Sequence, residues 1–134
     1  MTSLITVEAI GRAYAAKLQT LGINTCEQLL DKGATRKNRK EIAERTGIPE
    51  KLVLEWVNHV DLFRIRGVQQ QNAQLLEAVG VNTVPELAKR NAENLCQKLL
   101  AVNQDKRLVR QLPSLTRIID WIEQARRLDR AVTY

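Results

Sequence analysis

The residue types that most often carry catalysis or bind metals are sparse in this chain. Its two cysteines, Cys26 and Cys96, and its single histidine, His59, form neither a Cys-X-X-Cys pair nor a mixed Cys/His cluster. This spacing excludes the usual metal-binding patterns. The sequence also shows no acid paired with a base and no nucleophile beside a base. We therefore expect a protein that is not an enzyme and that uses no metal and no cofactor.

Positively charged residues, in contrast, have an unusual arrangement. One cluster consists of Arg36, Lys37, Arg39 and Lys40. It falls at the predicted start of a helix, where the helix dipole disfavours each positive charge by roughly 0.3 to 1 kcal/mol. Glu41 and Glu44 can pair with the two lysines at helical spacing, which is one explanation. The other is that a polyanion binds at this helix start.

The charge balance of the whole chain agrees with an acidic partner. Its 21 lysines and arginines outnumber its 15 acidic residues, which gives a net charge of +6. Such a balance favours nucleic acid or an acidic protein surface as the partner. The sequence contains no apolar run long enough to cross a membrane, and its free cysteines fit a reducing compartment. We expect a cytoplasmic protein with no membrane partner, either a monomer or a weak homodimer.

The elements that position these charges are organised as a repeat. The segment Leu21–Leu29 returns as Val79–Leu87, with Gly80 standing 58 residues after Gly22. Six positions are identical in this register, at predicted caps and core positions, which favours a structural repeat over chance. The identical pairs are Ala15 and Ala73, Leu18 and Leu76, Gly22 and Gly80, Asn24 and Asn82, Thr25 and Thr83, and Leu29 and Leu87.

Each copy of the repeated segment reads as a helix stop followed at once by a helix start. The glycines can take the left-handed conformation that ends a helix, and Thr25 and Thr83 can cap the next one. Gln28 and Glu86 stand three residues after these threonines. This spacing predicts a capping box in both copies.

The scarcity of aromatic residues, at 4%, argues against a sandwich or barrel and for helices. We predict an all-α domain over residues 1–134, built of about ten short helices in two repeat units, 1–66 and 67–134. Trp56 and Trp121 lie in apolar stripes and are predicted to be core anchors and not platforms for base stacking. Trp121 lies 41 residues after Gly80 and Trp56 lies 34 after Gly22, which predicts a seven-residue insertion between residues 90 and 110. Further predicted elements are a helix over 3–7, a helix over 12–21, and helices that begin at Thr35, Pro49 and Ser114.

Two tight bends between predicted helices resemble the helix-hairpin-helix motif, whose hairpin reads Gly-hydrophobic-Gly. The first bend is Ala9-Ile10-Gly11 and the second is Arg66-Gly67-Val68-Gln69. Two such units in tandem, each followed by a tryptophan-bearing helix, resemble a bacterial family of unknown function built from paired helix-hairpin-helix units. Each bend departs from the motif at one glycine: Ala9 replaces the first in one bend, and Gln69 replaces the second in the other.

The resemblance implies binding of DNA without sequence preference, through backbone amides of the hairpin that face a phosphate. Free N–H groups at a helix start, together with the positive end of its dipole, form an anion site. The resemblance places this role on Ile10 and Gly11 in the first bend and on Gly67 and Val68 in the second, and Arg64 and Arg66 before the second bend can donate hydrogen bonds to the same phosphate. Arg12 and Lys17 can add charge to the first hairpin, and the polar residues Gln69, Gln70, Gln71 and Asn72 can donate hydrogen bonds beside the second. These residues are otherwise explained as ordinary solvated helix faces.

The leading hypothesis is therefore a non-catalytic nucleic-acid-binding module of low sequence preference, with DNA favoured over RNA as the ligand. The alternative is a protein-interaction adaptor that keeps a helix-hairpin-helix scaffold and has lost DNA binding. The adaptor hypothesis predicts an exposed apolar patch or a stable dimer.

Overall fold

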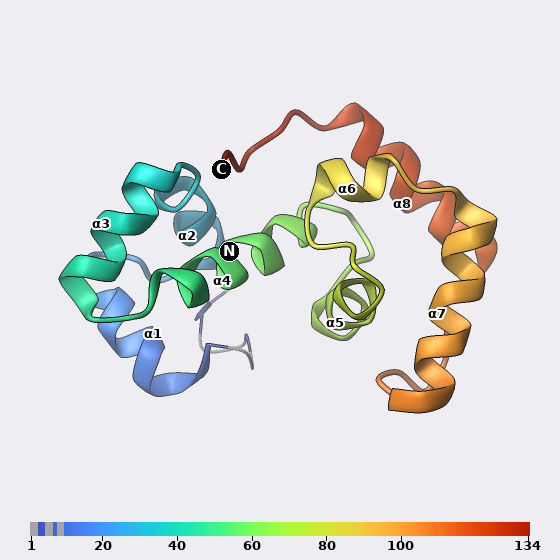
Figure 1. Cartoon of the computed structure of the whole chain (residues 1–134), viewed down its shortest axis with the longest axis horizontal. Helices are drawn as coiled ribbons and strands as arrows, with labels where there is room; N and C mark the ends of the chain where they lie inside the picture. Colours follow the sequence, from blue (N-terminus) through green and yellow to red (C-terminus); the bar gives the residue numbers. More distant parts are fainter. Residues whose placement is uncertain (1–2, 5–6, 8–9) are drawn as a thin grey trace. The chain divides into compact units, whose positions relative to one another are not determined.

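The computed structural model describes residues 3–4, 7 and 10–134. These residues form eight α-helices joined by short connections (Figure 1), so the prediction of an all-helical fold is confirmed for them. The helices are fewer than the ten or so that the sequence suggests. They are α1 (Gly11–Gln19), α2 (Cys26–Lys32), α3 (Arg36–Thr46), α4 (Glu50–Leu62), α5 (Gln70–Ala78), α6 (Val84–Ala88), α7 (Ala92–Lys106) and α8 (Leu115–Arg127).

Two sequence predictions fall wholly or partly outside the described residues. The first hairpin begins at Ala9, which is not described, and the helix predicted over 3–7 is described only at Ser3, Leu4 and Val7. Ser3 forms an isolated antiparallel bridge with Thr25. No helix in the described part of the chain has both the length and the apolar character needed to cross a membrane.

Five helices begin with a side-chain cap. In each, the side chain of the N-cap residue accepts a hydrogen bond from the amide three residues further on, which stabilises the helix by about 1 kcal/mol. The caps are Thr25 for α2, Thr35 for α3, Thr83 for α6, Asn91 for α7 and Ser114 for α8. All but Asn91 are caps that the sequence predicts.

The repeated segment has the same backbone course in both copies. Gly22 has φ of 78° and Gly80 has φ of 86°, both in the left-handed region that ends a helix. The amide after each glycine donates back to the preceding helix, at 3.1 Å in the first copy and 3.0 Å in the second. The helix stops predicted at these glycines are therefore present.

The predicted capping boxes form with one change of partner. The Oε1 atom of Gln28 accepts from the amide of Asn24 at 2.7 Å, and the Oε2 atom of Glu86 accepts from the amide of Asn82 at 3.0 Å. The motif would use the amide of the capping threonine itself. Here the residue before that threonine takes its place in both copies.

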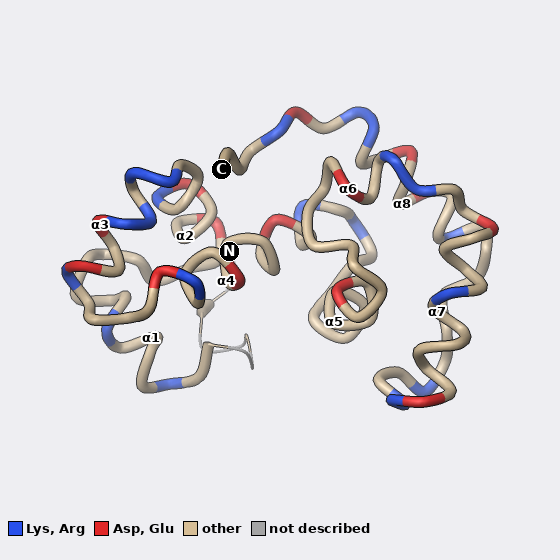
Figure 2. The backbone as a smooth tube through the Cα atoms, in the orientation of Figure 1, with Lys and Arg blue, Asp and Glu red and all other residues tan. Residues whose placement is uncertain are grey.

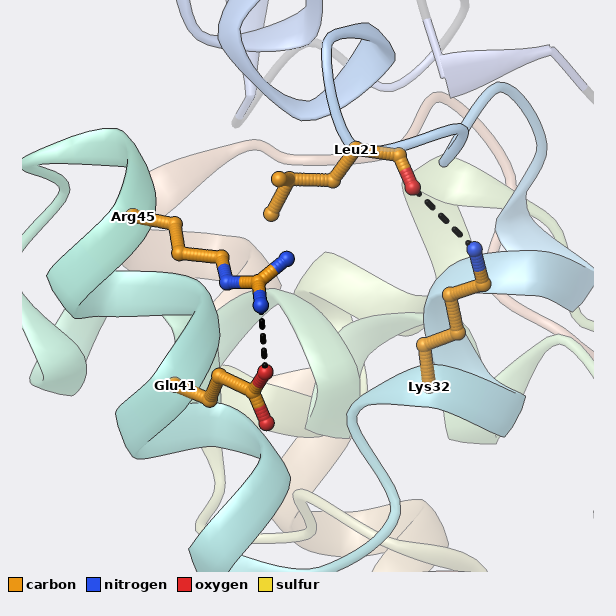
Figure 3. Close-up of polar contacts among 4 residues, drawn as sticks. All are labelled: Leu21, Lys32, Glu41 and Arg45. Carbon is orange, nitrogen blue, oxygen red and sulfur yellow. Dashed lines mark hydrogen bonds and ion pairs between the residues drawn. The ribbon is translucent and has the colours of Figure 1, made fainter.

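A long-range hydrogen bond also recurs in the register of 58. The Nζ atom of Lys32 donates to the carbonyl oxygen of Leu21 at 3.1 Å (Figure 3). In the second copy, Nη1 of Arg90 donates to the carbonyl oxygen of Val79 at 3.4 Å. A cation at or just after the end of α2 or α6 thus donates to the loop that precedes that helix in both copies. The two cations, Lys32 and Arg90, are not identical residues.

The chain divides into two compact units. Unit 1 comprises Met1–Asp61 together with Ala131–Tyr134, and unit 2 comprises Leu62–Arg130. Helices α1 to α4 therefore belong to unit 1, apart from Leu62 at the end of α4, and helices α5 to α8 belong to unit 2. The final four residues pack with unit 1, which sequence spacing does not indicate.

Each unit has a tryptophan in its core, as the apolar stripes predict. Trp56 is 3% exposed, and its ring lies against that of Tyr14 with 5.1 Å between the centroids. Trp121 is 1% exposed and belongs to the core cluster of unit 2. Both indoles are therefore structural residues and not surfaces on which a base can stack.

The insertion in the second half is spread over one helix and the connection after it. The helix α7 has 15 residues where α3 has 11. The connection 107–114 that follows α7 is also longer than the connection 47–49 that follows α3. Beyond it, α4 and α8 have 13 residues each, with the tryptophan at the same position.

Candidate functional site

The first hairpin uses its amides within the turn. The amide of Ile10 donates to the carbonyl oxygen of Val7 at 3.1 Å, and the amide of Gly11 donates to the same oxygen at 3.4 Å. The side chain of Ile10 is buried. The expectation that these two amides point outward at a phosphate is therefore corrected, because their hydrogen-bonding capacity serves the turn itself.

The charged residues after this hairpin remain at the surface. Arg12 and Lys17 are both exposed on α1. The Nζ atom of Lys17 lies 5.8 Å from the centroid of the Tyr14 ring, a weak cation–π contact that leaves the ammonium in solvent. The first hairpin therefore offers charge, without the two amides that the motif would add.

The basic cluster at the start of α3 contains three exposed residues and one buried residue. Arg36, Lys37 and Lys40 are exposed, as an anion site requires. Glu41, one of the two acids that could have neutralised them, pairs with Arg45 at 3.2 Å (Figure 3). The structure thus directs this carboxylate toward the end of the helix and away from the cations at its start.

Arg39 is the exception in this cluster. It is 2% exposed, and its guanidinium donates to the carbonyl oxygens of Gly33 at 2.9 Å, Ala34 at 3.1 Å and Thr133 at 2.7 Å. Burial lowers the pKa of Arg39, although an arginine remains charged at neutral pH. The prediction that Arg39 binds nucleic acid is corrected, since the guanidinium already serves these backbone oxygens.

The position of Arg39 in its helix explains its burial. It stands four residues after the cap of α3, and the equivalent residue of α7, four after the cap Asn91, is the fully buried Leu95. Arg39 therefore occupies a core position. Two of the carbonyl groups it satisfies, those of Gly33 and Ala34, belong to the loop between α2 and α3, where hydrogen-bond donors are needed because the loop is partly buried.

The exposed cations of unit 1 that the sequence assigns to phosphate binding lie on two different helices. In the view of Figure 2, α1 with Arg12 and Lys17 lies at the bottom of unit 1, and the start of α3 lies at the top. A long polyanion can contact the two helices in turn.

The backbone of the second hairpin is hydrogen-bonded to a side chain of α8. The amide of Arg66 donates to Oε1 of Gln124 at 2.8 Å, and Nε2 of Gln124 donates to the carbonyl oxygen of Arg66 at 3.1 Å. The amide of Val68 donates to the carbonyl oxygen of Ile65 at 3.1 Å, and the Val68 side chain is buried. Val68 is therefore an anchor of the bend and not a direct phosphate ligand.

Gly67 is required at this bend for two physical reasons. Its φ of 96° lies in the region that side chains disfavour. A Cβ atom built on it would lie 2.9 Å from Nε1 of Trp121, closer than such contacts occur. The glycine therefore lets the hairpin lie directly against α8.

Arg117 joins the second hairpin from α8, fifty residues further along the chain. Its Nη2 atom donates to the carbonyl oxygen of Gly67 at 3.4 Å, and its guanidinium lies 5.5 Å from the centroid of the Trp121 ring. The Nδ2 atom of Asn72 donates to the same Gly67 oxygen at 3.4 Å. Sequence reasoning missed Arg117, because only the fold brings α8 to the hairpin.

These residues enclose a surface pocket of about 650 Å³, which we call the hairpin-two pocket. Its lining residues are Gly67, Gln69, Gln70, Gln71, Asn72 and Arg117. All of them are among the described residues, and none carries a carboxylate. The pocket contains the start of α5, which the side chain of its N-cap residue Gln69 does not cap. The positive end of the α5 dipole also faces this end of the helix, which favours an anion there.

Comparison with known proteins gives a family and no function. The sequence model of a family described as Domain of unknown function (DUF4332) matches residues 8–128. The searches of curated proteins and of solved structures found no match.

Proposed function

The chain belongs to this family of domains of unknown function, and from its own side chains we propose that it is a non-catalytic module that binds nucleic acid with low sequence preference. The ligand we favour is DNA, contacted at its phosphates. The observation that carries the proposal is Arg117 in a pocket lined by carboxamides, without a carboxylate among its described lining residues.

The chemistry of the hairpin-two pocket suits a phosphate oxygen. The Arg117 guanidinium is oriented by the Gly67 carbonyl and by the Trp121 ring, so little side-chain entropy remains to be lost on binding. Guanidinium groups, carboxamides and helix-start amides are the donors that most often contact phosphates. Such contacts do not distinguish bases, which is the reason for the expected low sequence preference.

The repeat supports assignment of the chain as two helix-hairpin-helix units in tandem. Both copies share the glycine stop, the capped short helix and the cation that closes the loop. In both units the helix after the hairpin, α1 or α5, lacks the side-chain cap that five other helices have. In unit 1 the exposed Arg36, Lys37 and Lys40 would supply further phosphate contacts.

The proposal is tested by fluorescence anisotropy of a labelled duplex at several salt concentrations. Replacing Arg117→Gln should weaken binding to unrelated duplex sequences equally and lower the slope of log K against log salt by about 0.9, the value for one phosphate contact. The matched control is Arg110→Gln, which removes the same charge from an exposed position of unit 2 outside the pocket. Equal effects of the two substitutions would show that the pocket is not part of the DNA-binding surface.

One observation favours the adaptor as a second candidate function. Leu115 and Ile119 lie four residues apart on α8 and are 40% and 43% exposed. Residues at this spacing share one face of a helix, and an exposed apolar face can bind another protein. Affinity purification of the tagged chain with and without nuclease separates the two candidates. A partner that is retained after nuclease treatment and lost in Ile119→Gln would support the adaptor.

A further inference from the structure

We propose that unit 2 contains a second phosphate site, in a groove at the start of α7, and that this groove binds a phosphate of the nucleic acid. The inference rests on the proposed function for the identity of its ligand. The groove has a volume of about 380 Å³, and we call it the α7 groove. Its lining residues are Lys89, Arg90, Asn91, Asn94, Gln97, Lys98 and Ala101.

The composition of the α7 groove is that of an anion site. Three of its lining side chains are cations, three are carboxamides, and the only apolar one is Ala101. Each of these residues is described by the structure, and none is acidic. Three cations in one groove repel one another, and a phosphate placed among them would relieve that repulsion. The groove lies at a helix N-terminus, whose dipole also favours an anion.

Secondary structure brings these side chains to one surface. Asn94, Gln97, Lys98 and Ala101 are three or four residues apart on α7 and therefore share one of its faces. Lys89 and Arg90 precede the helix, and Lys89 is the C-cap of α6. The cations thus come from both sides of the short connection between the two helices.

Arg90 and Asn91 give the groove a defined edge. The Nη1 atom of Arg90 donates to the carbonyl oxygen of Val79 at 3.4 Å, which fixes the position of its guanidinium. The Oδ1 atom of Asn91 accepts from the amide of Asn94 at 3.0 Å. These bonds hold the edge in place before any ligand binds, and Lys89 and Lys98 add two exposed charges to it.

The acidic residue in the first turn of α7 does not contradict this assignment. Glu93 lies in the first turn of the helix, where a carboxylate stabilises the helix dipole, and it does not line the groove. An acidic peptide would fit this surface less well than a phosphate backbone. A peptide anchors itself through apolar side chains, and the groove offers Ala101 alone as an apolar contact.

The test compares two double variants of the full chain. Lys89→Gln with Lys98→Gln removes two charges from the groove, and Lys106→Gln with Arg110→Gln removes two exposed charges of unit 2 outside it. Salt-dependent anisotropy with a mixed-sequence duplex should show the slope reduced by about 1.8 in the groove variant, the value for two phosphate contacts. A smaller change is expected in the control. Equal slopes for the two variants, with binding by the wild type intact, would overturn the groove site and leave the proposed function standing.

A second measurement uses inorganic phosphate and does not depend on DNA binding. Titration followed by ¹⁵N NMR should shift the side-chain amide signals of Asn94 and Gln97 to saturation in the wild type and not in the groove variant. A linear drift without saturation, the same in both proteins, would overturn the site even if DNA binds elsewhere. Saturation without any DNA binding by the wild type would instead refute the proposed function and retain a phosphate site.

Discussion

Replacing Arg39→Met should destabilise the fold although it removes a single charge from a charged helix. Methionine keeps most of the apolar stem and removes the three hydrogen bonds from the guanidinium. The carbonyl oxygen of Ala34 would still accept from the amide of Thr133 at 2.8 Å. The oxygens of Gly33 and Thr133 would lose their Arg39 donors at a buried or partly buried place.

The magnitude follows from those two acceptors. A buried acceptor left without its partner costs about 1 to 3 kcal/mol, and some access of water at Thr133 reduces the sum. We expect a loss of about 2 to 4 kcal/mol in the free energy of unfolding. The matched control is Arg36→Met, three residues earlier on the exposed face of α3, with an expected change below about 0.5 kcal/mol.

The assay is urea unfolding of the full chain, followed by circular dichroism. Hydrogen exchange of the Thr133 amide gives a second readout, because Arg39 holds the residue whose amide pairs with Ala34. Exchange at Thr133 should accelerate in Arg39→Met and stay unchanged in Arg36→Met. If Arg39→Met unfolds within about 0.5 kcal/mol of the wild type, the structural role assigned to this arginine is refuted.

Three further substitutions test other parts of the account. Gly67→Ala should destabilise the chain by roughly 1 to 3 kcal/mol, because the φ of 96° at this position is strained for alanine and the new Cβ meets Trp121. An unchanged urea midpoint would contradict this expectation. Thr83→Ala should cost about 1 kcal/mol in the same assay by removing the cap of α6, whereas a Thr83→Ser variant that was equally destabilised would argue against the cap. The pKa of Cys26 is raised from 9.0 to about 11, chiefly by burial and further by the charge of Glu27. Folding therefore favours the protonated thiol over the thiolate. The stability that the protonated Cys26 contributes is complete below pH 9.0 and is lost as the pH rises toward about 11. Urea midpoints of Cys26→Ala should lack this part of the alkaline loss, and identical pH profiles for variant and wild type would show the assignment to be wrong.

Local signals in the sequence predicted much of the fold. Glycine at a helix stop and threonine or serine at a helix start act through their own backbone and hydroxyl geometry, so Gly22, Gly80 and Ser114 could be assigned without tertiary information. The spacing of apolar residues likewise predicted that Trp56 and Trp121 are buried. Such features depend on few residues close in sequence.

The features that the sequence did not predict depend on tertiary contacts. A run of cations suggests an exposed helix face, but the position of Arg39 relative to its cap turns it toward the core and the loop carbonyls. Arg117 could not be assigned to the second hairpin, because its place there follows from the packing of Trp121 against Gly67. The amide of Gly11 was expected to be open because hairpin geometry was inferred from residue types alone, and in the structure it donates to the turn.

The proposed function depends first on binding of the full chain to duplex DNA, measured by anisotropy over a series of salt concentrations and with two unrelated sequences. We expect binding at low salt, nearly equal affinity for the two sequences, and a linear fall of log K with log salt. We also expect a shallower slope when Arg36, Lys37 and Lys40 are replaced together by glutamine. Absence of binding at low salt, or an affinity that does not change with salt, would refute the proposal that the chain binds DNA through its phosphates.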